Sequence, residues 1–311
     1  MTGLLLLTLR ELRARKVVIG LFTVATVVWL VLALALQLDV VDGTLAGARL
    51  LTPVGVETIS DAEPADLDAP ILDEETGEPV VDPETGEPLT ERDRLDFGDT
   101  LLESLVFGAQ AFVAGAAYWI GILLALFATG GLVASLVERG QVDVVLTKPL
   151  SRASVLAARL GGVWLVMLAL VVYLFGAVWL TMSVKSGLWN PQFLLAIGVV
   201  FGMFVVVYGV VALVGVWSGS APLSLIVTLG LLFASLVLAI PGLPDQIDRT
   251  WRPLVVGAYH VLPKFGSVGA QLVPQLATGG AVGSLYPFLS SLAFGAVCYA
   301  AAFAIFARKD Y

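Results

Sequence analysis

The side chains that usually perform catalysis or hold metal ions are few and scattered in this sequence. It has one cysteine, Cys298, and one histidine, His260, in separate segments. A lone cysteine excludes an intramolecular disulfide and a cysteine-based metal site, and a lone histidine excludes a multi-histidine cluster. Met167, Met182 and Met203 have the thioether type that binds Cu(I), but they are dispersed, as core-filling methionines are. We therefore predict that this chain itself binds no metal and no other cofactor.

The apolar runs of the sequence also lack the side chains that acid–base chemistry within a membrane would need. The apolar runs 17–38, 161–182, 193–217, 223–240 and 285–306 contain no Asp, Glu, Lys, Arg or His. Membrane proteases, acyltransferases and proton-coupled carriers generally need such side chains at depth. The chain also has no GxxxxGK(S/T) pattern to hold nucleotide phosphates. A membrane enzyme is therefore disfavoured, and any ATP hydrolysis would belong to another polypeptide.

A short polar segment, 138–159, lies between two long apolar runs and predicts a short helix between two breaks. Gly140 ends the incoming helix, because glycine readily adopts the conformation needed at a helix C-terminus. Residues 141–147 then form a helix with an apolar side. Pro149 stops it, since the residue before a proline avoids the helical region, and Ser151 caps the next span. The segment is basic, so it faces the cytoplasm, where a helix across two spans can transmit a push from a soluble partner.

The motif in this segment resembles the first cytoplasmic loop of ABC-2-type transporter permeases. The likeness consists of ERG, a short apolar helix and a KPLSR run, with Gln141 standing where that family often has Thr. Two weaker likenesses agree with it, LRELRARK near the N-terminus and FARKDY at the end. The resemblance implies a set of ATPase-coupling residues. They are Glu138, Arg139, Gly140, Asp143, Val144, Val145, Leu146, Pro149, Ser151 and Arg152.

The family resemblance also implies partners and a mechanism. Two permeases, either two copies or a copy with a paralogue, would pair in the lipid bilayer with two ATP-binding cassette ATPase subunits, which bind ATP-Mg. Glu138, Arg139 and Asp143 would make polar contacts in a cleft of the ATPase. Closure of the ATPase dimer on ATP would tilt the flanking spans between two packings and drive transport, usually outward. Lipids, hydrophobic drugs, peptides and glycoconjugates suit the apolar spans equally well as substrates, and no nucleic-acid partner is expected.

The composition of the chain is that of a membrane protein. Charged residues make up 14% of it and mean hydropathy is +0.94, whereas about a quarter of the residues of a soluble domain are charged. The pattern predicts an all-α polytopic membrane protein with six transmembrane helices, at 17–38, 109–137, 161–182, 193–217, 223–240 and 285–306. The other predicted segments are an interfacial amphipathic helix at 1–16, an acidic extracytoplasmic loop at 39–103, a cytoplasmic coupling loop at 138–159, an extracytoplasmic re-entrant or interfacial segment at 241–284 and a cytoplasmic tail at 307–311. The first run is longer than a signal-peptide core, so we expect an uncleaved span.

Charge predicts which side each segment faces. With both termini inside, ten of the 17 Lys and Arg residues are cytoplasmic, but only four of the 25 acidic residues are. This split fits the positive-inside rule and predicts a multi-pass protein of the cell membrane with cytoplasmic termini. Within 241–284 we expect surface helices at about Trp251–Leu262 and Phe265–Leu276. Aromatic residues such as Tyr118, Tyr208 and Trp217 are expected mostly at span ends, in interfacial belts.

An acidic segment, 39–103, separates the first two predicted spans and holds nineteen Asp and Glu residues. The sequence Glu-Thr-Gly-Glu-Pro occurs at 75–79 and again at 84–88, which predicts a hairpin or a mobile loop. Clustered carboxylates suit calcium, but their spacing does not match an EF-hand. The alternative to a transporter is a membrane scaffold or receptor that uses this extracytoplasmic loop to bind a partner or a cation. Deletion of residues 61–95 would test this alternative.

Overall fold

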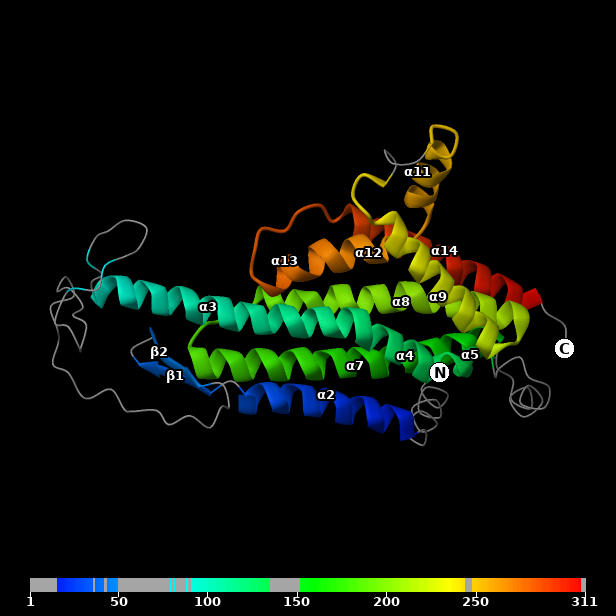
Figure 1. The fold of residues 1–311 in the computed structure, drawn as a ribbon. Helices are drawn as coiled ribbons and strands as arrows, with labels where there is room; N and C mark the ends of the chain where they lie inside the picture. The colour runs from blue at the N-terminus through cyan, green and yellow to red at the C-terminus, as the bar shows by residue number, and fades with distance from the viewer. Residues whose placement is uncertain are drawn as a thin grey trace.

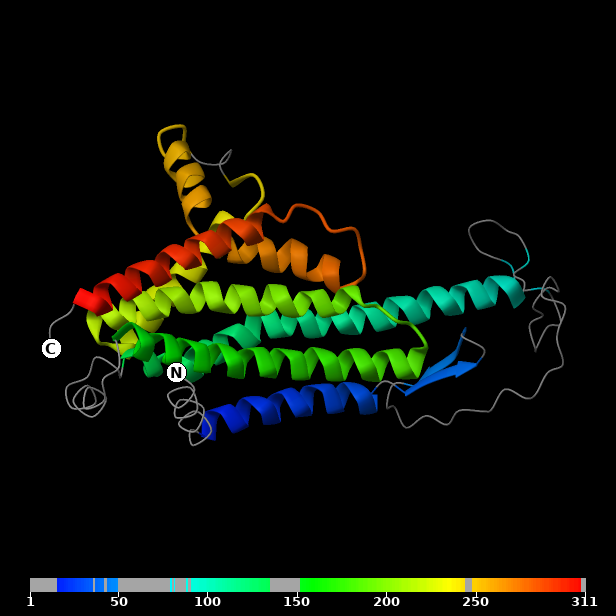
Figure 2. The same ribbon diagram turned by 180° about the vertical axis from the view of Figure 1, so that it is seen from behind.

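The computed structural model is mostly helical, and its long helices form one elongated bundle (Figures 1 and 2). It describes residues 16–35, 37–41, 44–49, 79, 81, 88, 91–134, 152–243 and 248–308. Five helices in this part of the chain are long and apolar enough to cross a membrane, which indicates a membrane protein. These are Leu102–Ala134, Ala153–Ser186, Gln192–Ser218, Ala221–Leu238 and Tyr286–Arg308.

Helix α8 (Gln192–Ser218) is the centre of the bundle. In the most apolar 18-residue window of this helix, 72% of the window is buried inside the protein. The corresponding share is 22–39% in the other four candidate spans. Helix α14 (Tyr286–Arg308) packs along it, and a Cβ at Gly209 would lie 3.3 Å from the Gly295 carbonyl, so small residues allow this close approach. Gly219, with φ of 67°, ends α8. Ser220 then caps helix α9 (Ala221–Leu238) by accepting a hydrogen bond from a first-turn N–H.

Helix α2 (Lys16–Ala35) lies along helix α7 (Arg152–Ser186). The Tyr173 hydroxyl lies 2.9 Å from the Thr26 hydroxyl and accepts the Trp29 indole N–H at 3.0 Å. Farther along the pair, the Lys185 ammonium group donates to the Ala33 carbonyl. The apolar part of α2, Val18–Leu34, is shorter than the five candidate spans. The predicted number of six spans therefore depends on α2.

Helix α3 (Glu91–Ala116) begins within the segment expected to be an acidic loop. The helical path continues through a π-helical turn, η1 (Ala117–Gly121), then α4 (Ile122–Thr129) and α5 (Gly131–Ala134). Figure 1 shows the start of α3 extending past the neighbouring helices. A polar helix end outside the bundle needs no apolar face, so the hydropathy pattern does not reveal it.

A small antiparallel hairpin follows α2, which an all-helical prediction leaves out. Strands β1 (Gln37–Val41) and β2 (Thr44–Arg49) pair with a register shift between Asp39 and Val40. Val81, which lies between the two copies of the Glu-Thr-Gly-Glu-Pro motif, forms an isolated antiparallel bridge with Pro88, the last residue of the second copy. The sequence predicts a hairpin or a mobile loop at this point.

The part of the α9–α14 connection that follows residue 248 contains short helices. They are α11 (Arg252–Val261), α12 (Phe265–Ser267) and α13 (Val273–Ala277), with the π-helical turn η2 (Val268–Leu272) between the last two. Helix α11 has no buried residue and projects from the side of the bundle (Figure 1). In contrast, α12, η2 and α13 pack against α9, α3 and α8, and Val268 and Ala277 are fully buried. A helical path is thus present at the predicted position, Phe265–Leu276, and it packs into the bundle, where its glycines allow close approach. Its place at the membrane surface stays a prediction.

Several chain segments meet at one end of the bundle (Figures 1 and 2). They are the start of α2, the end of α5, the start of α7, the α8–α9 turn and the end of α14. The opposite end carries the β1–β2 hairpin, the start of α3 and the α7–α8 turn. Segment 135–151 follows α5 and precedes α7. Both helices therefore meet it at the bundle end that also holds the start of α2 and the end of α14.

Candidate functional site

Nearly all residues predicted to contact an ATPase lie outside the described part of the chain. These are Glu138, Arg139, Gly140, Asp143, Val144, Val145, Leu146, Pro149 and Ser151. Arg152 is the first residue of α7. The flanking helices are described: α5 ends at Ala134, α7 begins at Arg152, and the two helices contact each other. Both ends of segment 135–151 are therefore attached to a packed pair of helices.

Two π-helical turns, η1 and η2, meet inside the bundle. Tyr118 in η1 is fully buried, its ring stacks on Phe265 with centroids 4.5 Å apart, and its hydroxyl donates to the Phe265 carbonyl at 2.7 Å. Trp119 packs edge-on against both rings. Gly269 in η2 lies so close that a Cβ there would be 2.5 Å from Tyr118 Cε1. We call these four residues the aromatic junction.

The aromatic junction connects the helix that leads into segment 135–151 with the buried helix at 265–277. Single π-helical turns inside α-helices occur frequently at functional sites. Here each turn supplies one side of the same contact, Tyr118 from η1 and Gly269 from η2. A displacement of α4 and α5 would therefore reach the helix at 265–277 directly, through packed side chains.

Two tyrosines expected at span ends connect helices in the interior instead. Tyr208 is fully buried and donates to the Thr129 carbonyl at 3.2 Å, and Tyr118 belongs to the aromatic junction. The interfacial prediction is thus wrong for these two, whereas Trp217, near the end of α8, is 66% exposed. A buried tyrosine keeps its ring in apolar surroundings and uses its hydroxyl to bond a carbonyl of the next helix.

Two buried amides join three elements near the opposite end of the bundle. Asn190 Nδ2 donates to Gln110 Oε1 on α3 and to the Ala277 carbonyl on α13, both at 2.9 Å. The Trp179 indole N–H donates to the Asn190 carbonyl at 2.9 Å. Gln110 is fully buried, and its Nε2 has no partner within the described part of the chain. The cluster contains no ionisable side chain, so its only signal in the sequence is Gln110, a single amide within an apolar run.

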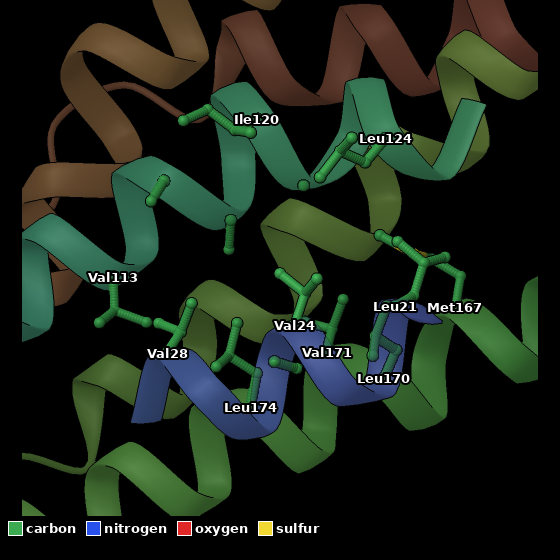
Figure 3. Close-up of a pocket in the computed structure, with 14 residues that line it drawn as sticks. Leu21, Val24, Val28, Val113, Ile120, Leu124, Met167, Leu170, Val171 and Leu174 are labelled. Carbon is green, nitrogen blue, oxygen red and sulfur yellow. The ribbon is translucent and has the colours of Figure 1, made fainter. Parts of the chain in front are cut away.

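An apolar cavity of about 170 Å³ lies between α2, the helical path from α3 to α4, and α7 (Figure 3). Figure 3 shows Val28 of α2 and Val113 of α3 pointing toward one another at its edge. Three lining residues, Val24, Ile120 and Leu124, are 43–59% exposed, so the cavity opens onto the outer surface of the bundle. Met167 is also a lining residue, while Met182 and Met203 are buried in the core. The lining suits an apolar chain.

Filling this cavity is expected to stabilise the protein. Gly121 lines it, and a Cβ there would meet nothing closer than 3.9 Å, so Gly121→Leu can place its side chain in the hollow. The matched control is Gly115→Leu on the same helix, which also has free space but does not line the cavity. Both variants gain helix propensity. We expect Gly121→Leu to exceed the control by about 1–2 kcal/mol in unfolding free energy measured in mixed micelles. Equal stability of the two variants would contradict the presence of a cavity that a side chain at position 121 can fill.

Two buried serines attach the α11–α12 connection to neighbouring spans. The Ser235 hydroxyl on α9 donates to the Pro263 carbonyl at 2.7 Å and accepts the Gly266 N–H at 3.3 Å. The Ser291 hydroxyl on α14 accepts the backbone N–H of Lys264 at 2.8 Å. This holds Lys264 in place with its side chain only 3% exposed. Burial lowers the pKa of the Lys264 ammonium group, because desolvation disfavours the charged form.

Comparison of the chain with protein-family models, with curated proteins and with solved structures found no match. A functional assignment therefore depends on the motif in 138–152 and on the geometry of the helices around it.

Proposed function

We propose that this chain is the permease subunit of an ABC-2-type ATP-driven transporter, most simply an exporter. In this proposal it binds no nucleotide itself and pairs with a second permease, either another copy or a paralogue. ATP-binding cassette ATPase subunits, which hold ATP-Mg, attach to its cytoplasmic end.

One observation carries the proposal: the motif-bearing segment is inserted between two packed helices at one end of an apolar bundle. The motif runs from Glu138 to Arg152, and the helices on either side of it, α5 and α7, contact each other. A soluble ATPase that pushes on this segment would displace both helices. The aromatic junction, which lies on the helix leading into the segment, would pass that displacement to the buried helix at 265–277.

The proposed topology counts α2 as a sixth span beside the five long apolar helices. Its 20 residues measure about 30 Å, which equals the hydrocarbon thickness of a bilayer. Both termini and segment 138–159 then face the cytoplasm of the cell, with an interfacial helix at 1–16. The acidic segment between α2 and α3 and the connection 241–284 lie on the outer side.

The test is a pull-down of this chain in mild detergent from its own cells. We expect a Walker-motif ATPase to co-purify in stoichiometric amount. Replacing Glu138 and Arg139 together with alanine should lower its recovery at least about tenfold, the scale of losing one charged hydrogen bond.

A matched control is the double variant Asp248→Ala, Arg249→Ala. It removes the same two residue classes from exposed positions on the side proposed to face outward, and it should leave ATPase recovery unchanged. Recovery of the intact chain without any ATPase would overturn the transporter proposal. The scaffold alternative, with binding through 39–103, would then replace it.

A further inference from the structure

Lys264 is the charged side chain most deeply enclosed by the described residues. It lies between α11 and α12 and is 3% exposed. Its ammonium group donates to the Ser290 hydroxyl at 2.9 Å and lies over the rings of Tyr259 and Tyr286, at 5.0 and 4.8 Å from their centroids. Within the described part of the chain these contacts include no carboxylate. A buried cation is therefore surrounded by one hydroxyl and two aromatic faces.

These contacts compensate the charge only in part. Two cation–π contacts and one hydrogen bond recover only part of the free energy that burial of an ammonium group costs. A chain that needed only packing at this point would be served better by an apolar residue of similar volume. The enclosed charge therefore suggests a ligand of opposite sign.

Beside Lys264 lie two side chains that reach the surface and could complete an anion site, Tyr286 and His260. Tyr286 is 49% exposed, and its hydroxyl lies 3.1 Å from Nδ1 of the exposed His260. The pair can donate one hydrogen bond to an oxyanion, from the Tyr286 hydroxyl when Nδ1–H donates to it, or from the His260 Nε2–H when the hydroxyl donates to Nδ1. Around them the surface is apolar, with Val261 67% exposed and Leu289 57% exposed. A cation with polar donors beneath an apolar rim fits the head of an amphiphile whose chains lie in the membrane.

We propose that Lys264, Tyr286 and His260 form a binding site for a phosphate-type oxyanion, carried by a lipid-like amphiphile or free in solution. Lys264 supplies the charge, as lysine does in many phosphate sites, and the Tyr286–His260 pair adds a directional hydrogen bond. The two buried serines, Ser235 and Ser291, fix the backbone so that the ammonium group does not withdraw. This site does not depend on an ATPase partner.

The experiment uses the purified full-length chain in phosphatidylcholine nanodiscs containing a small fraction of phosphatidylglycerol. Native mass spectrometry measures which lipid stays bound after release from the disc. We expect the wild type to retain phosphatidylglycerol over phosphatidylcholine, and Lys264→Met to lose this preference about tenfold. Arg249→Met removes a positive charge from an exposed position of the same connection and should keep it.

Further arms separate the two sources of phosphate. Displacement of phosphatidylglycerol by millimolar inorganic phosphate would support a headgroup site. Phosphate binding that is lost in Lys264→Met, without lipid preference, would support a soluble ligand. If Lys264→Met is not recovered in folded form, Ser290→Ala and Tyr286→Phe keep the charge and should each weaken binding severalfold. No preference and no phosphate binding in the wild type, or equal binding by wild type and Lys264→Met, would overturn the proposal.

Discussion

Gly269→Ala is expected to destabilise the protein by about 1–3 kcal/mol, the usual cost of overpacking a core. The new Cβ would lie 2.5 Å from Tyr118 Cε1 and 2.6 Å from Trp119 Cζ2. The Tyr118 ring cannot move away freely, because it stacks on Phe265 and its hydroxyl is bonded to the Phe265 carbonyl. The cost should exceed the gain of about 0.5–1 kcal/mol that alanine has over glycine in a helix. Unfolding in mixed micelles measures the difference.

The control is Gly198→Ala within α8, where an added Cβ would meet no atom within 4 Å. This variant should be as stable as the wild type or up to about 1 kcal/mol more stable. Adding Trp119→Leu to Gly269→Ala should restore part of the lost stability, because contacting residues are coupled. If Gly269→Ala and Gly198→Ala have equal stability, the close contact in the aromatic junction is refuted.

The apolar spans could be predicted because their signal is local. The run 193–217 nearly coincides with α8, Gln192–Ser218, since both ends of that helix carry turn residues that the sequence displays. The start of α3 at Glu91 could not be predicted in the same way. Its first residues are mostly polar and extend beyond the bundle, so no apolar run marks them. The burial of residues 265–277 could not be predicted for a related reason, because glycines are typical both of loops and of closely packed helices.

The interior contacts could not be predicted because they join residues far apart in the sequence. Tyr118 bonds a carbonyl 147 residues away, and Asn190 bonds Gln110 across 80 residues. Periodicity shows that a helix has a buried face but not which helix covers it. Lys264 shows the same limit: its sequence surroundings, rich in Pro and Gly, suggest an exposed loop, yet side chains of α11 and α14 enclose it.

The proposed coupling role predicts that Gly140→Pro disconnects the ATPase from the spans. Proline fixes φ, removes an N–H and restricts the residue before it, here Arg139, so the segment cannot keep the bend that glycine allows. We expect insertion, ATPase recovery and ATP hydrolysis to persist, while transport falls at least about tenfold. Hydrogen exchange provides a readout that needs no known substrate. In the wild-type complex ATP trapping should alter exchange in η1 (Ala117–Gly121) and η2 (Val268–Leu272), and in Gly140→Pro this change should disappear.

Gly77→Pro is the matched control, since it makes the same substitution in the acidic segment on the proposed outer side. Its response to ATP should equal that of the wild type, which would show that proline in a loop is not disruptive in general. The comparison isolates the path from segment 135–151 through α5 and α4 to the aromatic junction. If Gly140→Pro responded to ATP as the wild type does at normal expression, the segment would be an ordinary basic tether. The ATPase contact would then have to be sought at another part of the same bundle end, such as the α8–α9 turn.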